Sequence, residues 1–222
     1  MNRTQATIEQ VLIAAENVKL AGELVLPRDH AGIVVFAHGS GSSRLSPRNR
    51  HVAEFLQEGN LGTLLLDMLT PEEQAIDERT RHLRFDIDLL TRRLVGTIDW
   101  IGTQDLMRQL PIGLFGASTG AAAALAAAAQ RADVVAAVVS RGGRPDLAAE
   151  ALPRVTAPVL LIVGSYDSDV IQLNRQAADR LRCERRLEIV AGASHLFEEP
   201  GKLEDVSRLA RAWFQTHLMT TA

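Results

Sequence analysis

Short apolar runs divide this chain of 222 residues, with longer stretches of mixed polarity between them. Such runs are typical of strands buried on both faces of a parallel sheet. We expect strands of this kind at 32–37, 61–66, 111–115, 134–139 and 158–163, and a last, more polar one at 186–190. The stretches between them carry helical patterns, so strands and helices alternate along the chain.

The N-terminal part has a different pattern. Two strand-like segments, 7–13 and 18–26, are joined through 15–17, which is typical of a hairpin turn. An antiparallel hairpin followed by alternating strands and helices predicts an α/β fold. We expect a mostly parallel sheet of about eight strands with helices on both faces. Nothing in the composition marks a second unit, so we expect a single domain over residues 1–222.

Three of the helical stretches have recognisable boundaries or breaks. Serine and proline at 46–47 predict the start of a helix that ends before Gly59. Residues 70–106 are charged and helical in pattern, with a break expected near Gly96 or a kink before it. The last helix is expected at 202–217, where apolar residues recur along one stripe.

One pentapeptide carries the strongest chemical signal. G-A-S-T-G at 116–120 stands directly after an expected strand and directly before an alanine-rich helix. In that context G-x-S-x-G predicts a sharp turn that exposes the hydroxyl of Ser118 at the carboxyl end of the sheet. The two glycines fit such a turn because it leaves no room for a Cβ atom.

Further reactive groups follow other expected strands. His38 begins H-G-S-G-S-S at 38–43, Asp167 ends G-S-Y-D at 164–167, and His195 ends G-A-S-H at 192–195. Because the carboxyl ends of parallel strands share one edge of the sheet, these side chains are expected near Ser118. The chain order serine, aspartate, histidine is the order found when this turn carries a catalytic triad.

Each residue type suits one step of acyl transfer. Ser118 would attack, His195 would take its proton and later return it to the leaving group, and Asp167 would hold the imidazole tautomer. The oxyanion would be stabilised by the backbone N–H of Thr119 and by that of Ser40. This arrangement implies no metal and no organic cofactor.

These motifs resemble those of the α/β-hydrolase superfamily, and most closely its small dienelactone-hydrolase-like members. The resemblance covers essentially the whole chain and rests on H-G-S-G at 38–41, G-A-S-T-G at 116–120, G-S-Y-D at 164–167 and S-H-L-F at 194–197. It implies catalytic roles for Ser118, Asp167 and His195. Dienelactone hydrolases proper use a cysteine nucleophile where this chain has serine, which favours a general esterase.

Other interpretations of these residues stay open. Ser118 could be a small residue in a tight turn, and 39–43 could be a phosphate loop, although it lacks the lysine of that motif. Asp167 could cap the following helix. Asp169 and Asp67 are alternative acids for the triad.

Arginines gather near the same edge of the sheet. They are Arg44, Arg48, Arg50, Arg141 and Arg144. Because guanidinium groups bind carboxylate and phosphate, Arg44 and Arg141 are candidate substrate-binding residues and the substrate could carry an anionic group. Alternatively, one of them pairs with Asp67 or another loop carboxylate. The segment 71–84 is too short and polar for a lipase lid, so long-chain lipids are not expected substrates.

Composition narrows the function classes. Hydrophobic residues make up 46% and charged residues 23%, with a net charge of −3, which indicates no nucleic-acid or membrane-surface partner. A single cysteine, Cys183, excludes an intrachain disulfide. Without a secretion signal or an apolar spanning segment, a cytoplasmic protein is expected.

The sequence therefore predicts a serine hydrolase that cleaves a small ester, lactone or thioester through an acyl-serine intermediate. An acyltransferase with the same triad and a non-catalytic binding domain are the alternatives. The oligomeric state is not predicted.

Overall fold

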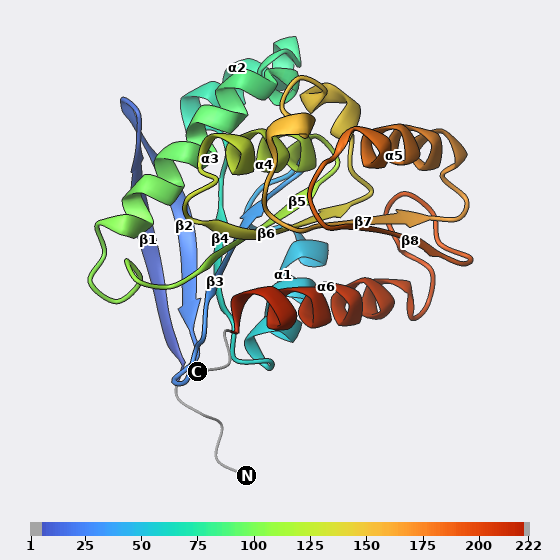
Figure 1. Cartoon of the computed structure of the whole chain (residues 1–222). Helices are drawn as coiled ribbons and strands as arrows, with labels where there is room; N and C mark the ends of the chain where they lie inside the picture. The colour runs from blue at the N-terminus through green and yellow to red at the C-terminus, as the bar shows by residue number, and fades with distance from the viewer. Residues whose placement is uncertain (1–5, 220–222) are drawn as a thin grey trace.

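A computed structural model describes residues 6–219 of the chain and contains one eight-stranded sheet (Figure 1). The strands are β1 (Thr7–Ala15), β2 (Val18–Leu26), β3 (Ile33–Ala37), β4 (Gly62–Leu66), β5 (Ile112–Ala117), β6 (Val135–Arg141), β7 (Val159–Gly164) and β8 (Arg185–Val190). Their order is β1-β2-β4-β3-β5-β6-β7-β8, and β2 pairs antiparallel with β1 and β4 while the other pairs are parallel. The predicted fold class is confirmed.

Helices cover both faces of this sheet, as Figure 1 shows. They are α1 (Pro47–Gln57), α2 (Pro71–Thr80), α3 (Ile87–Gly102), α4 (Thr119–Gln130), α5 (Ser168–Arg180) and α6 (Lys202–Leu218). One apolar cluster joins α3 and α4 to one face, and a second joins α1 and α6 to the other. Within residues 6–219, no helix combines the length and the apolar character needed to cross a bilayer.

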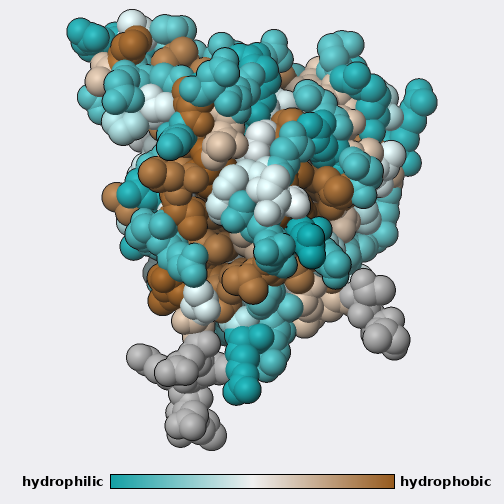
Figure 2. All heavy atoms as spheres, turned by 90° about the vertical axis from the view of Figure 1, so that its left-hand side faces the viewer, coloured by the Kyte–Doolittle hydropathy of each residue, from teal (hydrophilic) through white to brown (hydrophobic). Residues whose placement is uncertain are grey.

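The strand β1 forms one edge of the sheet. Ile13 and Ala15 on its inner side are buried in the cluster that includes α3, whereas Ile8 and Leu12 on its outer side are 68% and 65% exposed. Figure 2 shows this side of the molecule, where apolar side chains form a band between polar ones.

The region 70–106 departs from the expectation in one respect. Its helix does not break near Gly96, which lies inside α3. The chain instead leaves α2 at Arg81, whose φ of 57° is left-handed, and Asp86 caps the start of α3. Gly96 has a packing role: a Cβ atom there would lie 2.8 Å from Cα of Ala15, so the glycine lets α3 approach β1.

The parallel strands β3, β5, β6 and β7 end at the same edge, and so does β8 beside β7. The loops that follow them carry the residues singled out in the sequence. A capped helix fixes one of these loops, because the side chain of Ser46 accepts a hydrogen bond from the N–H of Asn49 at 3.4 Å and Pro47 begins α1.

Candidate active site

Ser118 occupies a strained turn between β5 and α4. Its backbone has φ 51° and ψ −119°, a left-handed conformation that costs a side-chain-bearing residue free energy. Two hydrogen bonds to the neighbouring segment hold it: the N–H of Ser118 donates to the carbonyl of Arg141 at 3.2 Å, and the N–H of Arg144 donates to the carbonyl of Ser118 at 3.1 Å. This is the geometry that the G-x-S-x-G pattern predicted.

The two glycines of that pattern permit close packing around the turn. A Cβ atom at Gly116 would lie 2.4 Å from Cα of Ala121, and one at Gly120 would lie 2.3 Å from the carbonyl oxygen of Ala37. Both contacts are with backbone atoms, which cannot move aside cheaply. The expectation that neither position tolerates a Cβ atom is confirmed.

His195 and Asp167 form a direct hydrogen bond. Nδ1 of His195 lies 2.6 Å from Oδ2 of Asp167. Asp167 precedes α5, but its side chain makes no capping hydrogen bond, so the alternative role as a helix cap does not apply. Asp169 is exposed, and the carboxylate of Asp67 accepts a hydrogen bond from the backbone N–H of Arg44. The structure thus brings together the histidine and the first of the three candidate acids.

The loop that carries His195 is held from two sides. The N–H of Ser194 donates to both carboxylate oxygens of Glu199, at 3.1 and 3.0 Å, and this contact lowers the pKa of Glu199. Gly142, with φ 52°, lies against the imidazole: a Cβ atom there would be 3.4 Å from two ring atoms of His195. This contact places the imidazole of His195 beside the end of β6.

Ser118 and His195 line one cavity of about 240 Å³, together with Ser40 and Arg141. Thr119 is buried at the first position of α4, directly after Ser118. Among residues 6–219, this conformation has the hydrogen bond between His195 and Asp167 but none between Ser118 and His195. Catalytic hydrogen bonds are often long without substrate and tighten when it binds.

Arg141 is a buried cation in the wall of this cavity. Its side chain is 6% exposed; Nη2 donates to Oδ1 of Asn49 at 3.4 Å, and Nε has no partner within the described chain. The guanidinium lies 6.0 Å from the ring centre of Phe197. Burial, together with the charge of Arg48, lowers the pKa of Arg141 to about 10, so it stays protonated at neutral pH.

The other four arginines singled out in the sequence have carboxylate partners. Arg44 donates from its backbone N–H to Asp67 at 2.7 Å and from its guanidinium to the same carboxylate. The remaining pairs are Arg48 with Glu198, Arg50 with Glu23 and Arg144 with Asp146. Within residues 6–219, Arg141 alone of the five has no ion pair. The structure thus separates the two predicted substrate-binding arginines: Arg141 faces the cavity of Ser118, and Arg44 braces Asp67.

His38 is tied to backbone groups. Its Nε2 accepts a hydrogen bond from the N–H of Met68 at 3.0 Å, so Nδ1 carries the proton and donates to the carbonyl of Gly39 at 2.9 Å. Burial lowers the pKa of His38 and keeps it neutral. The residue therefore shapes the loop after β3.

Sequence reasoning missed the roles of three residues that support the site. Asn49 and Phe197 flank Arg141, but neither directly follows a strand, where the sequence search looked. The available signal for Asn49 was a polar residue on the buried stripe of a helix. Arg84 was missed as well. Its Nη1 lies 2.9 Å from where a Cβ of Gly41 would be, so it packs against the loop after β3.

Comparisons with known proteins agree with this fold. Residues 22–220 match the model of the "Dienelactone hydrolase family". A crystal structure of dienelactone hydrolase from Anabaena variabilis is 58% identical, covers 96% of this chain and 99% of its own, and superposes with a TM-score of 0.95. Est1E from Butyrivibrio proteoclasticus, with a TM-score of 0.80 and 16% identity over 93% of this chain and 98% of its own, shares the fold.

Two curated Mycobacterium tuberculosis proteins are also similar. Each bears the name "Putative phosphoribosyl transferase" and is 54% identical over 210 residues, which is 95% of this chain and 46% of the relative. The chain thus spans about half the length of these relatives. A family match over residues 22–220, together with the fold shared with a relative 58% identical, leads to one conclusion: the chain belongs to the dienelactone hydrolase family.

Proposed function

We propose that this protein hydrolyses a small ester, lactone or thioester through an acyl-serine intermediate. The observation that carries the proposal is the 2.6 Å hydrogen bond between Asp167 and His195, in a site where His195 shares a cavity with the strained Ser118. That combination supplies a nucleophile, a base and a group that orients the base.

The reaction proceeds in two halves. Ser118 Oγ attacks the carbonyl carbon while Nε2 of His195 takes its proton, and Asp167 stabilises the resulting imidazolium. When the tetrahedral intermediate collapses, the bond to the leaving group breaks and His195 returns the proton to it. Water then attacks the acyl-serine with the same base, which releases the acid and restores Ser118.

The negative oxygen of the intermediate requires donors that are already in place. We assign this role to the backbone N–H groups of Thr119 and Ser40. Thr119 is suited to it because its N–H is one of the free donors at the start of α4, where the helix dipole also favours negative charge. Losing one such donor typically costs about 3 kcal/mol of transition-state stabilisation.

An anionic group on the substrate is the second part of the proposal. Arg141 supports it, since a buried guanidinium without a carboxylate partner in the described chain lacks the compensation that buried charges normally have. A substrate carboxylate or phosphate in the cavity of Ser118 would provide it. Arg44, which is already paired with Asp67, is the weaker candidate for this role.

The name of the M. tuberculosis relatives suggests a different chemistry. We attribute that transferase activity to the part of the relatives beyond this chain, because the shared segment matches the hydrolase family nearly throughout. Incubation with 5-phosphoribosyl diphosphate is then expected to release no pyrophosphate. Release that depends on the protein would contradict this assignment.

The central experiment uses p-nitrophenyl esters of varied chain length and charge, with the native chain and Ser118→Ala. We expect hydrolysis by the native chain and its loss in the variant, and covalent labelling of Ser118 by a fluorophosphonate. Activity that survives Ser118→Ala would remove the nucleophile. Products formed with added alcohols or amines distinguish an acyltransferase, and absence of labelling would favour a non-catalytic domain.

A further inference from the structure

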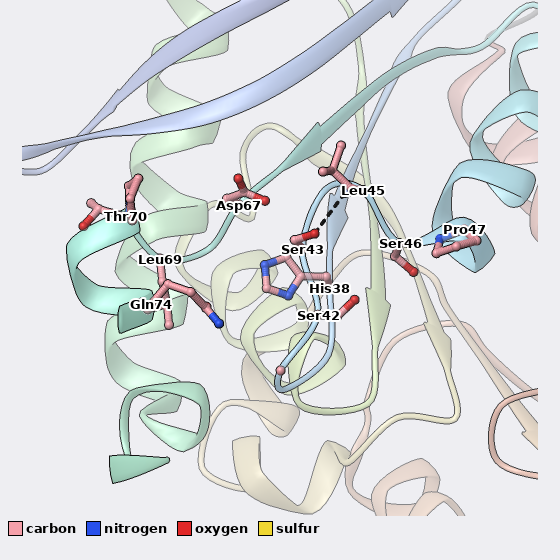
Figure 3. A pocket seen from close by; sticks show the side chains of 12 residues that line it. His38, Ser42, Ser43, Leu45, Ser46, Pro47, Asp67, Leu69, Thr70 and Gln74 are labelled. Carbon is pink, nitrogen blue, oxygen red and sulfur yellow. Dashed lines mark hydrogen bonds between the residues drawn. The ribbon is translucent and has the colours of Figure 1, made fainter. Parts of the chain in front are cut away.

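A second cavity adjoins the catalytic one. It measures about 420 Å³ and is lined by the loop 41–47 and by residues 67–74, which run from the end of β4 into α2. Figure 3 looks into it: the amide of Gln74 points from α2 toward His38 and the loop that carries Ser42. Ser42 and Ser46 line both cavities, so the two cavities meet at this loop.

The size of the catalytic cavity indicates that a substrate extends beyond it. Pockets that enclose a small molecule usually measure about 300–1,000 Å³. The cavity of Ser118, at about 240 Å³, is below that range, whereas the two cavities together fall within it. The adjoining space is therefore the natural continuation of the site.

The strand order decides which half of an ester points there. His195, which must protonate the leaving group, lies on the β6–β8 side of Ser118, next to Gly142. The second cavity lies on the opposite side, over the ends of β3 and β4. When the leaving group faces His195, the acyl group on the other side of the carbonyl carbon points toward the second cavity.

The lining describes the acyl group that fits. Leu45, Pro47, Leu69 and Pro71 are apolar, and the carboxylate of Asp67 is neutralised by Arg44. Two polar groups of the lining, Ser42 Oγ and the amide of Gln74, form no hydrogen bond with the described residues and can bind a ligand. Such a surface suits an uncharged, partly apolar chain that can carry a hydroxyl or carbonyl group.

We propose that this second cavity, formed by 41–47 and 67–74, binds the acyl group of the substrate as an uncharged chain. The inference rests on the proposed esterase function and deepens it. It divides recognition between two sides of Ser118, with the anionic group near Arg141 on the leaving-group side and the neutral chain over β3 and β4.

The test fills the cavity and measures acyl-chain preference. Gln74→Trp places a large ring in the cavity from α2, and Leu45→Trp does so from the opposite wall. The control is Ala75→Trp, because Ala75 follows Gln74 on the same helix and does not line either cavity. Each protein is assayed for kcat/KM with p-nitrophenyl acetate and hexanoate, which share one leaving group.

We expect the hexanoate-to-acetate ratio of kcat/KM to fall at least about tenfold in Gln74→Trp and Leu45→Trp, the discrimination typical of a few apolar methylenes, and to stay constant in Ala75→Trp. An unchanged ratio in both filled variants overturns the inference. The same proteins are assayed with hexyl acetate: a lower kcat/KM for this ester with no change for the hexanoate also overturns the inference, since it would place the leaving group in the second cavity. Failure of the native chain to hydrolyse either ester through Ser118 would instead refute the proposed function.

Discussion

Arg141 carries a charge that no carboxylate among residues 6–219 neutralises. Removing an ionised group from water costs several kcal/mol unless an opposite charge compensates it. The contacts of Arg141 are an amide oxygen of Asn49 at 3.4 Å and the face of Phe197, both weaker than an ion pair. If Arg141 stabilises the fold, its removal should lower the free energy of unfolding. If it binds a ligand, its removal should lower activity and leave the fold as stable as before.

We expect Arg141→Met to lower kcat/KM for 3-carboxyphenyl acetate at least about tenfold more than for the neutral 3-carbamoylphenyl acetate, because only the former can pair with the guanidinium. The free energy of unfolding, measured in urea, should stay the same or rise by about 1 kcal/mol, since an uncompensated charge has been removed. Equal losses on both esters, together with a less stable protein, would identify Arg141 as a brace.

Asp167 is expected to act through His195. Asp167→Asn should lower kcat about 10³–10⁴-fold at neutral pH, because an amide favours the wrong imidazole tautomer and cannot stabilise the imidazolium. The matched control is Asp169→Asn, two residues along and exposed, which should keep the activity of the native chain. Steady-state rates with p-nitrophenyl acetate test both; similar rates for the two variants would contradict the assignment.

The sequence could predict which residues of the site come together, but not all of their partners. Ser118, Asp167 and His195 each follow a strand whose end the alternating pattern locates, so their proximity depends only on the fold. Whether Arg44 or Arg141 is paired depends on which loop carboxylates lie within reach. That information requires loop conformations, which hydrophobic periodicity does not encode.

Among the elements, the segment from α2 to α3 supports the loop after β3 through one buried ion pair. Burial acts to raise the pKa of Asp77, but hydrogen bonds from the side chain and backbone of Arg84 and its positive charge outweigh it, so the pKa lies below its usual value. Nε of Arg84 is 2.5 Å from Oδ2 of Asp77, while Nη1 faces Gly41. The pair thus connects a surface helix with the proposed oxyanion loop.

We expect Arg84→Ala to lower the free energy of unfolding by about 3 kcal/mol, because it leaves a buried carboxylate without its partner. The double variant Asp77→Ala/Arg84→Ala should lose less than the sum of the single changes. Because the folded pKa of Asp77 is lowered, its contribution is present above the unfolded pKa near 3.8 and disappears as the pH falls through the folded value. Urea unfolding of the three variants tests this; strict additivity would contradict it.

The same segment shows where sequence patterns fail. Gly96 looked like a helix breaker because glycine has poor helix propensity, yet α3 runs through it. The loss in propensity is offset by close packing on Ala15, a contact between distant parts of the chain. The strands, in contrast, could be placed within a few residues, because burial on both faces leaves a local signature.

At the scale of the whole molecule, a buried neutral histidine makes stability depend on pH. Burial lowers the pKa of His38 below its ordinary value of 6.5, so the unfolded chain binds a proton that the folded chain does not. The contribution of His38 to the free energy of unfolding is therefore fully present above pH 6.5. It falls as the pH drops below 6.5, until the folded pKa is reached.

His38→Gln removes this proton uptake and keeps a donor and an acceptor in the loop. We expect the free energy of unfolding to fall less between about pH 7 and pH 5 in this variant than in the native chain, as measured by urea titration at each pH. His30→Gln is the control, since His30 is only partly buried whereas His38 is buried. Parallel pH profiles for all three proteins would contradict the prediction.

One expectation about the whole chain stays a prediction. It is the single domain over 1–222: the strands of the described residues form one sheet, and the chain spans about half the length of its M. tuberculosis relatives.

The left-handed backbone at position 118 has a consequence for protein engineering. Glycine adopts that conformation without strain, so Ser118→Gly would relax the turn and remove the hydroxyl in the same step. Heat tolerance and turnover are thus opposed at this one position. A directed-evolution screen that scores only thermal resistance would enrich inactive variants with glycine at this position. A screen that also scores turnover would retain the strained Ser118.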